Sequence, residues 1–473
     1  MTTSTTTFKA TCTPEEVGLS TIGLKEAFEK AMELKHVLSG QPLSGGTMFV
    51  ARHGQVCFVD SFGMKDVSQP ETKMTPDTLF NIASMTKTIT SIGIMLLYQD
   101  KLLNLDDDVA KTFPCMAKEN LKVGKIDGTT EPCERPITIR HLMTHTAGFS
   151  YGMLFQGGLK NHAQTEAFSF KFGYNKPEDF ANTTLAFQPG TQFRYSQATN
   201  LLGLMIEKIS GISLETFFQK RIFQPLGMIE TSFNVQSNVS KLSIEQYGTN
   251  ERSEKVNVIK VFHEIERGSP NVESLSLTNL SNLGRSPELG HGGLFSSPSD
   301  WWKLCQMLLN RGYPIMDVST YSTMVEPNTP ELNDHGGFIS HRTDNPDTGG
   351  HFLFANFFPG GIAHNLTGEC VISTNNIAGA SIGTFGWEGI FTTKYTIDVQ
   401  EDMCICFFSN TAPCWRYNFK GEILPLVYRS LLEPNVPHYE AFTNAKFAPT
   451  DTKWKLGDLI PSQHDIKKTS SKL

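Results

Sequence analysis

The sequence predicts an α+β fold, in which an antiparallel β-sheet is flanked by helices and a mainly helical region is inserted between two halves of the sheet. Alternating apolar runs joined by short turns, which are typical of β-hairpins, occur near both ends of the chain, at 48–62 and 394–410. Apolar residues between these runs recur mostly at helical spacing. We therefore expect strands from the two ends of the 473-residue chain to form one sheet.

The first elements are a helix and a hairpin. Residues 22–38 predict an amphipathic helix, whose buried face carries Leu24, Phe28 and Met32. Residues 48–62 alternate apolar and polar side chains on either side of His53-Gly54, and this pattern predicts a β-hairpin that turns at the dipeptide.

Helices dominate the middle of the chain. Residues 84–100 predict a deeply buried helix with apolar side chains at Met85, Ile89, Ile92 and Leu96. Residues 199–209 predict a second buried helix, which Gly211 ends, and residues 300–309 predict a third.

The C-terminal part returns to strands. The run at 394–410 predicts a hairpin that turns near 400–402, and a last helix is expected at 419–432, before Pro434. The predicted regions are a flexible N-terminus at 1–20, a sheet region at 21–110 plus 286–434, an inserted mainly helical region at 111–285 with a Ser- and Asn-rich insertion at 234–285, and a C-terminal extension at 435–473 that ends in Ser-Lys-Leu.

Composition excludes some functions. The net charge is 41 − 48 = −7 and no basic block is present, so nucleic-acid binding is not expected. No apolar run is long enough to span a bilayer, and the N-terminus has no secretory signal. The nine cysteines show no zinc-binding spacing, although Cys404 and Cys406 would share one face of a strand. We expect reduced, mostly structural thiols in an intracellular compartment, and no metal or cofactor.

The terminal tripeptide Ser471-Lys472-Leu473 has the sequence of a peroxisomal address. It predicts recognition by the peroxisomal import receptor, and therefore a eukaryotic protein of the peroxisomal matrix; without import the protein would be cytoplasmic.

Ser84 and Lys87 form a Ser-x-x-Lys pattern at the start of the helix predicted for 84–100. Positions i and i+3 lie on one face of a helix, so the Lys87 amine can contact the Ser84 hydroxyl. A serine needs a base in contact to become a nucleophile, and a lysine acts as one when burial lowers its pKa. The pattern is compatible with nucleophilic catalysis, but by itself it fits better a helix N-cap followed by a solvated lysine.

Five segments resemble the serine β-lactamase and penicillin-binding protein-like superfamily, with the best likeness to its class C β-lactamase and esterase branch. The segments lie in the family's order at 77–114, 137–152, 189–211, 292–304 and 385–411. The resemblance implies a β-lactamase/transpeptidase-like fold. It also implies that Ser84 is the acylating serine, that Lys87 is its lysine and that Tyr195 is the catalytic tyrosine. The backbone amides of Ser84 and Ile390 would form the oxyanion hole.

This chain departs from the family at two motifs. Gln197 stands where the Tyr-x-Asn motif has asparagine, so its hydrogen bond to Lys87 or to a substrate amide would shift. Trp387-Glu388-Gly389 replaces Lys-Thr-Gly, the clamp for a β-lactam carboxylate. Glu388 would add a like charge there, while Gly389 would let substrate approach the strand closely. These four positions are the predicted substrate-binding residues, and they argue for neutral esters or thioesters over β-lactams.

The sequence does not predict a metal-binding or catalytic role for three of the histidines. His141 and His145 lie four positions apart, as zinc ligands on a helix do, but no Glu follows the first as in His-Glu-x-x-His. The family has a histidine at the position of His145 in a structural turn. His291 belongs to a segment that lines the site in the family, so a structural role is favoured over a substrate contact.

The predicted function is that of an esterase-like serine hydrolase. It would act through a covalent acyl-enzyme on a small-molecule ester, thioester or amide, with a phenol at Tyr195 that Lys87 holds near its anionic form. One alternative is an acyltransferase or transesterase that uses the same acyl-enzyme. Another is a non-catalytic binding protein that keeps the fold.

Overall fold

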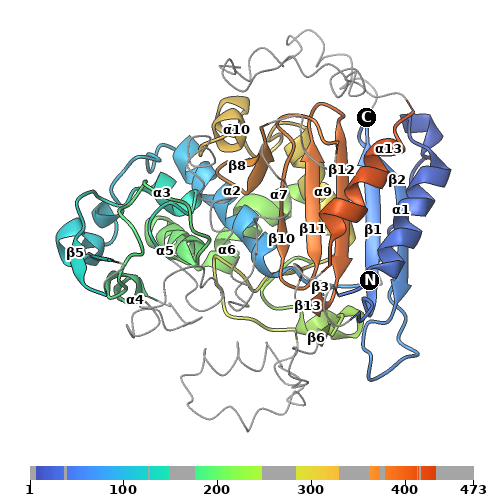
Figure 1. Cartoon of the computed structure of the whole chain (residues 1–473), viewed down its shortest axis with the longest axis horizontal. Helices are drawn as coiled ribbons and strands as arrows, with labels where there is room; N and C mark the ends of the chain where they lie inside the picture. Colours follow the sequence, from blue (N-terminus) through green and yellow to red (C-terminus); the bar gives the residue numbers. More distant parts are fainter. Residues whose placement is uncertain are drawn as a thin grey trace. The chain divides into compact units, whose positions relative to one another are not determined.

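A seven-stranded antiparallel sheet organises the protein, in the order β2-β1-β12-β11-β10-β9-β8 (Figure 1). The computed structural model describes residues 7–36, 40–125, 128–149, 176–244, 246–247, 284–329, 362–372, 379–412, 414 and 417–432. The strands are β1 (Gly45–Arg52), β2 (Gln55–Gly63), β8 (Ile362–His364), β9 (Glu369–Val371), β10 (Phe385–Gly389), β11 (Thr393–Asp398) and β12 (Met403–Ser409). Because β1 pairs with β12, the two ends of the chain form one sheet, and the predicted α+β fold is confirmed.

Both predicted hairpins are confirmed. His53 and Gly54, which join β1 to β2, have φ angles of 54° and 74°. Positive φ at both central residues is the requirement of a type I′ turn, whose twist matches that of the strands. The second hairpin joins β11 to β12 and turns at Gln400–Asp402.

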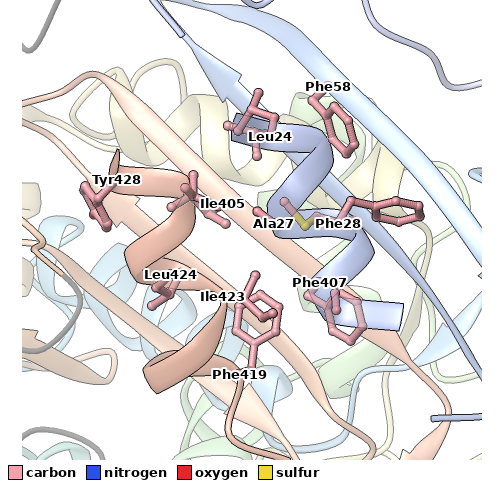
Figure 2. Close-up of a cluster of buried hydrophobic side chains, with 14 of the residues drawn as sticks. Leu24, Ala27, Phe28, Phe58, Ile405, Phe407, Phe419, Ile423, Leu424 and Tyr428 are labelled. Carbon is pink, nitrogen blue, oxygen red and sulfur yellow. The ribbon is translucent and has the colours of Figure 1, made fainter. Parts of the chain in front are cut away.

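One face of the sheet packs against α1 (Thr21–Glu33), α12 (Phe419–Glu422) and α13 (Leu424–Arg429). Figure 2 shows Leu24, Ala27 and Phe28 of α1 beside side chains from β2, β12, α12 and α13. The helix predicted at 22–38 therefore exists, but it ends at Glu33, and Met32 is 44% exposed. The buried stripe runs through Ala27 and Ala31 instead, which leaves Met32 one position to the side of it.

The predicted last helix, 419–432, is wrong as a single element, because it is divided at Ile423 into α12 and α13. Pro425 lies in the first turn of α13. A proline has no N–H for a helical hydrogen bond, so a new helix begins there more easily than an old one continues.

The other face of the sheet packs against α2 (Thr86–Gln99) and α9 (Pro298–Leu309). The rings of Trp301 and Tyr395 lie 5.4 Å apart, and the Tyr395 hydroxyl is 2.8 Å from Thr88 Oγ1. Every residue of α2 from Thr86 to Leu97 is buried, because α5 (Ala198–Ser210) and α6 (Leu214–Phe218) cover its other side. The predicted helices at 84–100, 199–209 and 300–309 are thus confirmed, and Gly211 ends α5 with a left-handed φ of 73°.

Shorter elements complete the described chain. They are α3 (Ile139–Met143), α4 (Pro177–Ala181), α7 (Gln224–Leu226), α10 (Val318–Val325), β3 (Phe80–Asn81), β4 (Lys122–Gly124), β5 (Thr130–Pro132), β6 (Gln246–Tyr247), β7 (Phe295–Ser296), β13 (Thr411–Ala412) and the 3-10 turn η2 (Ala83–Met85). Most of the helices between β3 and β7 belong to the region predicted as an insertion. Most of the Ser- and Asn-rich stretch at 234–285 lies outside the described residues, as does the C-terminal extension.

Residues 7–20 contact the sheet region. Thr11 N donates to Val56 O at 2.7 Å, and Ser20 N donates to Ser430 O at 2.8 Å. Among the described helices, none has the length and apolar character needed to cross a membrane.

A buried ion pair fixes the N-terminal segment to the β11–β12 turn. Arg52 Nη2 is 2.7 Å from Glu401 Oε2, Arg52 Nη1 donates to Val17 O at 2.8 Å, and both side chains are at most 1% exposed. Removal of one partner leaves a buried charge uncompensated. Glu401→Gln should therefore lower the free energy of unfolding by about 3–5 kcal/mol, measured by urea denaturation.

The matched control is Asp100→Asn. It removes the half-exposed pair with Arg221 and should cost at most about 1 kcal/mol. Equal losses in the two variants would contradict the special role of the buried pair.

Candidate active site

Ser84 lies in the 3-10 turn η2, between β3 and the first residue of α2. The preceding residue, Ala83, has a φ of +44°, a conformation that costs energy for any residue except glycine. Hydrogen bonds hold it there: Ala83 N donates to Asn81 Oδ1 at 3.0 Å, and Ile82 N donates to Leu294 O at 3.0 Å. The pairing of β3 with β7 thus fixes the turn that presents the Ser84 hydroxyl.

Lys87 contacts the nucleophile as the Ser-x-x-Lys spacing predicts. Its Nζ lies 3.0 Å from Ser84 Oγ and donates to the His291 carbonyl at 2.8 Å. The side chain is 3% exposed, and burial holds the pKa of the Lys87 amine well below its usual value. A neutral amine at this distance can accept the serine proton.

Tyr195, just before α5, completes the cluster. Lys87 Nζ lies 4.8 Å from the centroid of its ring. Burial raises the pKa of the Tyr195 phenol, although hydrogen bonds with Ser84 and Trp387 act in the opposite direction. Burial favours the uncharged form of both groups, which does not support the hypothesis that Lys87 holds this phenol near its anionic form; the catalytic roles of Lys87 and Tyr195 stay a prediction.

An aromatic and imidazole cluster surrounds Tyr195. Its ring centroid lies 4.9 Å from that of His145 and 5.4 Å from that of Trp387, and His364 packs on Trp387 at 5.3 Å. Burial lowers the pKa of both histidines, that of His364 to about 4, so both imidazoles are neutral at neutral pH. His141 lies in a different setting, where its Nδ1 accepts a hydrogen bond from Thr138 N at the start of α3.

Two contributions to the site were missed by sequence reasoning. His364 comes from β8, and no local motif marks it as a neighbour of Trp387. His291 contributes its backbone carbonyl, which accepts a hydrogen bond from Lys87. A backbone carbonyl is common to all residues, so no residue pattern predicts this contact. The glycines on either side of His291, at 290 and 292, were the available signal that the backbone turns there.

The end of β10 lies against the turn that carries Ser84. A Cβ on Gly389 would come within 2.4 Å of Ile82 O, and Thr393 Oγ1 donates to the same carbonyl at 3.3 Å. Position 389 is therefore glycine because β10 packs closely against the backbone of Ile82. The sequence had instead predicted that this glycine lets substrate approach the strand. Ile390 follows directly and packs with Ala83 and Phe391 in one cluster. The oxyanion hole from the amides of Ser84 and Ile390 stays a prediction.

The Glu388 carboxylate does not face the site as an unpaired negative charge, which the sequence had predicted. Successive strand residues face opposite sides of a sheet, so its side chain lies on the other face of β10 from Trp387. It forms a buried ion pair with Lys394, and Lys420 Nζ is 3.9 Å from Glu388 Oε2. The expected repulsion of a substrate carboxylate is therefore offset by two ammonium groups.

Gln197 is buried next to the start of α5, and within the described part of the chain its Oε1 accepts no hydrogen bond. The sequence predicts that the hydrogen bond of this side chain to Lys87 or to a substrate amide shifts, and within the described residues no bond from Lys87 reaches Gln197 Oε1. A buried acceptor without a donor is costly, so Gln197 Oε1 is a candidate to accept a hydrogen bond from bound substrate.

Fold and site together define a serine enzyme that works through an acyl-enzyme intermediate. A sequence profile of the family described as Beta-lactamase matches residues 24–419, and the chain belongs to this family.

Relatives in this family act in acyl chemistry. The chain is 34% identical over 168 residues to lovastatin esterase of Penicillium rubens, covering 33% of this chain and 40% of that protein. It is 25% identical over 340 residues to ML-236A carboxylate methylbutanoyltransferase of Penicillium citrinum, covering 67% and 73%. Simvastatin synthase (LovD) of Aspergillus terreus, unliganded, has the same fold, with a TM-score of 0.66 at 20% identity over 88% of this chain and 98% of its own.

Gly389→Ala should lower kcat about 10²-fold or more without unfolding the protein. The added methyl group would push β10, and with it the Ile390 amide, away from the Ser84 turn, and loss of one oxyanion donor costs that much in hydrolases. The measurement is steady-state hydrolysis of a chromogenic ester. Gly292→Ala is the matched control, because its Cβ would meet no atom nearer than Ala83 O at 4.0 Å. Full activity of Gly389→Ala would contradict the assignment.

The lowered pKa of Lys87 sets the pH dependence. The neutral amine is the active form, so activity should be lost as the pH falls through that pKa. The unfolded chain binds the proton up to the ordinary pKa of 10.5, so the folded state gains stability as the pH rises through this window. Lys87→Met should therefore lower kcat about 10²–10⁴-fold, yet raise the melting temperature at pH 7.

Calorimetry at pH 7 and near pH 10 tests this, since the gain in stability should shrink at the higher pH. The control is Lys394→Met, which removes the partner of Glu388 and should lower the melting temperature instead. A stability loss in Lys87→Met would show that the amine is not a destabilising base.

Proposed function

We propose that the protein is a carboxylesterase that cleaves small neutral esters or thioesters through an acyl group on Ser84. The observation that carries this proposal is the contact of 3.0 Å between Ser84 Oγ and a buried Lys87 amine. It supplies the base without which a serine is a weak nucleophile.

The residues divide the reaction between them. Lys87 accepts the proton as Ser84 Oγ attacks the carbonyl carbon, and the amides of Ser84 and Ile390 stabilise the oxyanion. Tyr195 donates a proton to the leaving alcohol or thiol and is reprotonated from Lys87, 4.8 Å from its ring. Water then attacks the acyl-enzyme, with the same groups acting in reverse.

Ester substrates are favoured over β-lactams for two reasons. The Lys-Thr pair that binds a β-lactam carboxylate in the family is replaced by Trp387-Glu388, which supplies neither a cation nor a hydroxyl at these positions. The Trp387 and Tyr195 rings, with the neutral imidazoles beside them, make an apolar wall that suits an uncharged acyl group.

Acyl transfer to an alcohol is the second candidate. The similarity to a methylbutanoyltransferase favours it, since transfer and hydrolysis share the acyl-enzyme and differ only in the acceptor. Release of acyl product that rises with added alcohol, while water-dependent turnover stays slow, would identify a transferase. The non-catalytic alternative is disfavoured by the assembled contacts of Ser84, Lys87 and Tyr195.

A fluorophosphonate probe should label the wild-type protein once, at Ser84. Peptide mapping by mass spectrometry gives the site, and Ser84→Ala should remain unlabelled. Ser91→Ala, which removes a buried serine from the adjoining helix α2, should label as the wild type does. A folded wild-type protein that the probe leaves unmodified would contradict an activated nucleophile and favour the binding protein.

We also propose that Ser471-Lys472-Leu473 directs the protein to peroxisomes. A fluorescent protein that carries the last 12 or so residues should gather in peroxisomes of a eukaryotic cell, and deletion of the tripeptide should leave it in the cytosol. Diffuse fluorescence of the intact fusion would contradict the address.

A further inference from the structure

Three cysteines meet in the core on the face of the sheet that packs against α2 and α9. Cys305 comes from α9, and Cys404 and Cys406 come from β12, where their spacing of two places both on one face, as the sequence predicted. All three are fully buried. The proposed reaction at Ser84 uses none of them.

The three sulfur atoms form a ready set of ligands. Cys305 Sγ is 3.7 Å from Cys406 Sγ, and all three sulfurs lie within 4.8 Å of one another. Bonds of 2.3 Å from one ion to three thiolates place the sulfurs about 4 Å apart. The cluster therefore needs little movement to hold one thiophilic ion in a trigonal arrangement. No histidine or carboxylate among the described residues joins the set, so a fourth ligand for tetrahedral zinc is lacking.

The charge of the loaded site decides which ion fits. Copper(I) with two or three thiolates would leave net negative charge in an apolar core, which is costly.

We propose that Cys305, Cys404 and Cys406 form a binding site for trivalent arsenic, taken up from arsenite. Arsenous acid reacts with three thiols to give an arsenic tris-thiolate and three waters. Three As–O bonds break, three As–S bonds form, and each thiol proton leaves in a water molecule. No oxidation state changes and the product is neutral, so no charge enters the core. The ion would join α9 to β12.

Arsenite titration of the reduced protein tests this site. Intact-mass spectrometry should find one arsenic per chain, with a mass gain of one arsenic less three hydrogens. The thiols that react after denaturation should fall from nine to six, since three of the nine cysteines are bound. Because the site is buried, one arm adds arsenite to the folded protein and a second arm refolds the protein with arsenite present. Binding to the native state should also raise the melting temperature as arsenite increases.

Cys305→Ala should abolish uptake. The matched control is Cys370→Ala, which removes another fully buried thiol on β9 and should leave one arsenic per chain bound. If Cys305→Ala does not fold, Cys404→Ala or Cys406→Ala serves in its place. The proposal is overturned if neither arm takes up arsenic, if uptake persists in the cluster variants, if copper(I) but not arsenite binds, or if two thiols disappear as a disulfide without arsenic.

Discussion

A buried lysine amine, held between the Ser84 hydroxyl and the His291 carbonyl, is the constraint on which the rest of the structure depends. The amine must lose its proton to act as a base, and water must be kept away for that to happen. The burial of α2 on all sides meets this need, because the sheet covers one flank and α5 and α6 cover the other. The burial of α2 therefore removes water from the Lys87 side chain. The hydrophobic contacts around the helix offset the free energy that this desolvation costs.

The strand β10 connects the catalytic cluster to the rest of the sheet. On one face its Trp387 ring lies on Tyr195, and on the other face Glu388 pairs with Lys394 and approaches Lys420. Lys420 also contacts Glu369, so two carboxylates and two lysine side chains meet in one network. Burial lowers the pKa of Lys420 to about 7, so the charge of this side chain changes near neutral pH. The strand at the site is therefore supported by apolar rings on one side and by compensated charge on the other.

Sequence reasoning predicted most of the fold because periodicity and turn residues are local signals. The turn at His53-Gly54, the glycine that ends α5 and the Ser84–Lys87 contact each depend on residues only a few positions apart. The failures have a different origin. Met32 is exposed because the helix faces the sheet through its alanines, which hydrophobicity alone does not single out. The raised pKa of the Tyr195 phenol, the ion pair of Glu388 and the packing of His364 on Trp387 arise from burial and from contacts between distant segments.

The pairing of β1 with β12 has a consequence for how the chain acquires its structure. The paired residues Gly46 of β1 and Ser409 of β12 lie 363 positions apart in the sequence, so this pairing forms only after the chain as far as Ser409 has left the ribosome. Until then the β1 edge presents unpaired backbone groups, which are a template for wrong partners. The turn that carries Ser84 also lacks its contact with β10 until then, because β10 is synthesised in the same C-terminal segment. A chain truncated before β10 would therefore carry Ser84 and Lys87 but would lack the complete seven-stranded sheet and the assembled site.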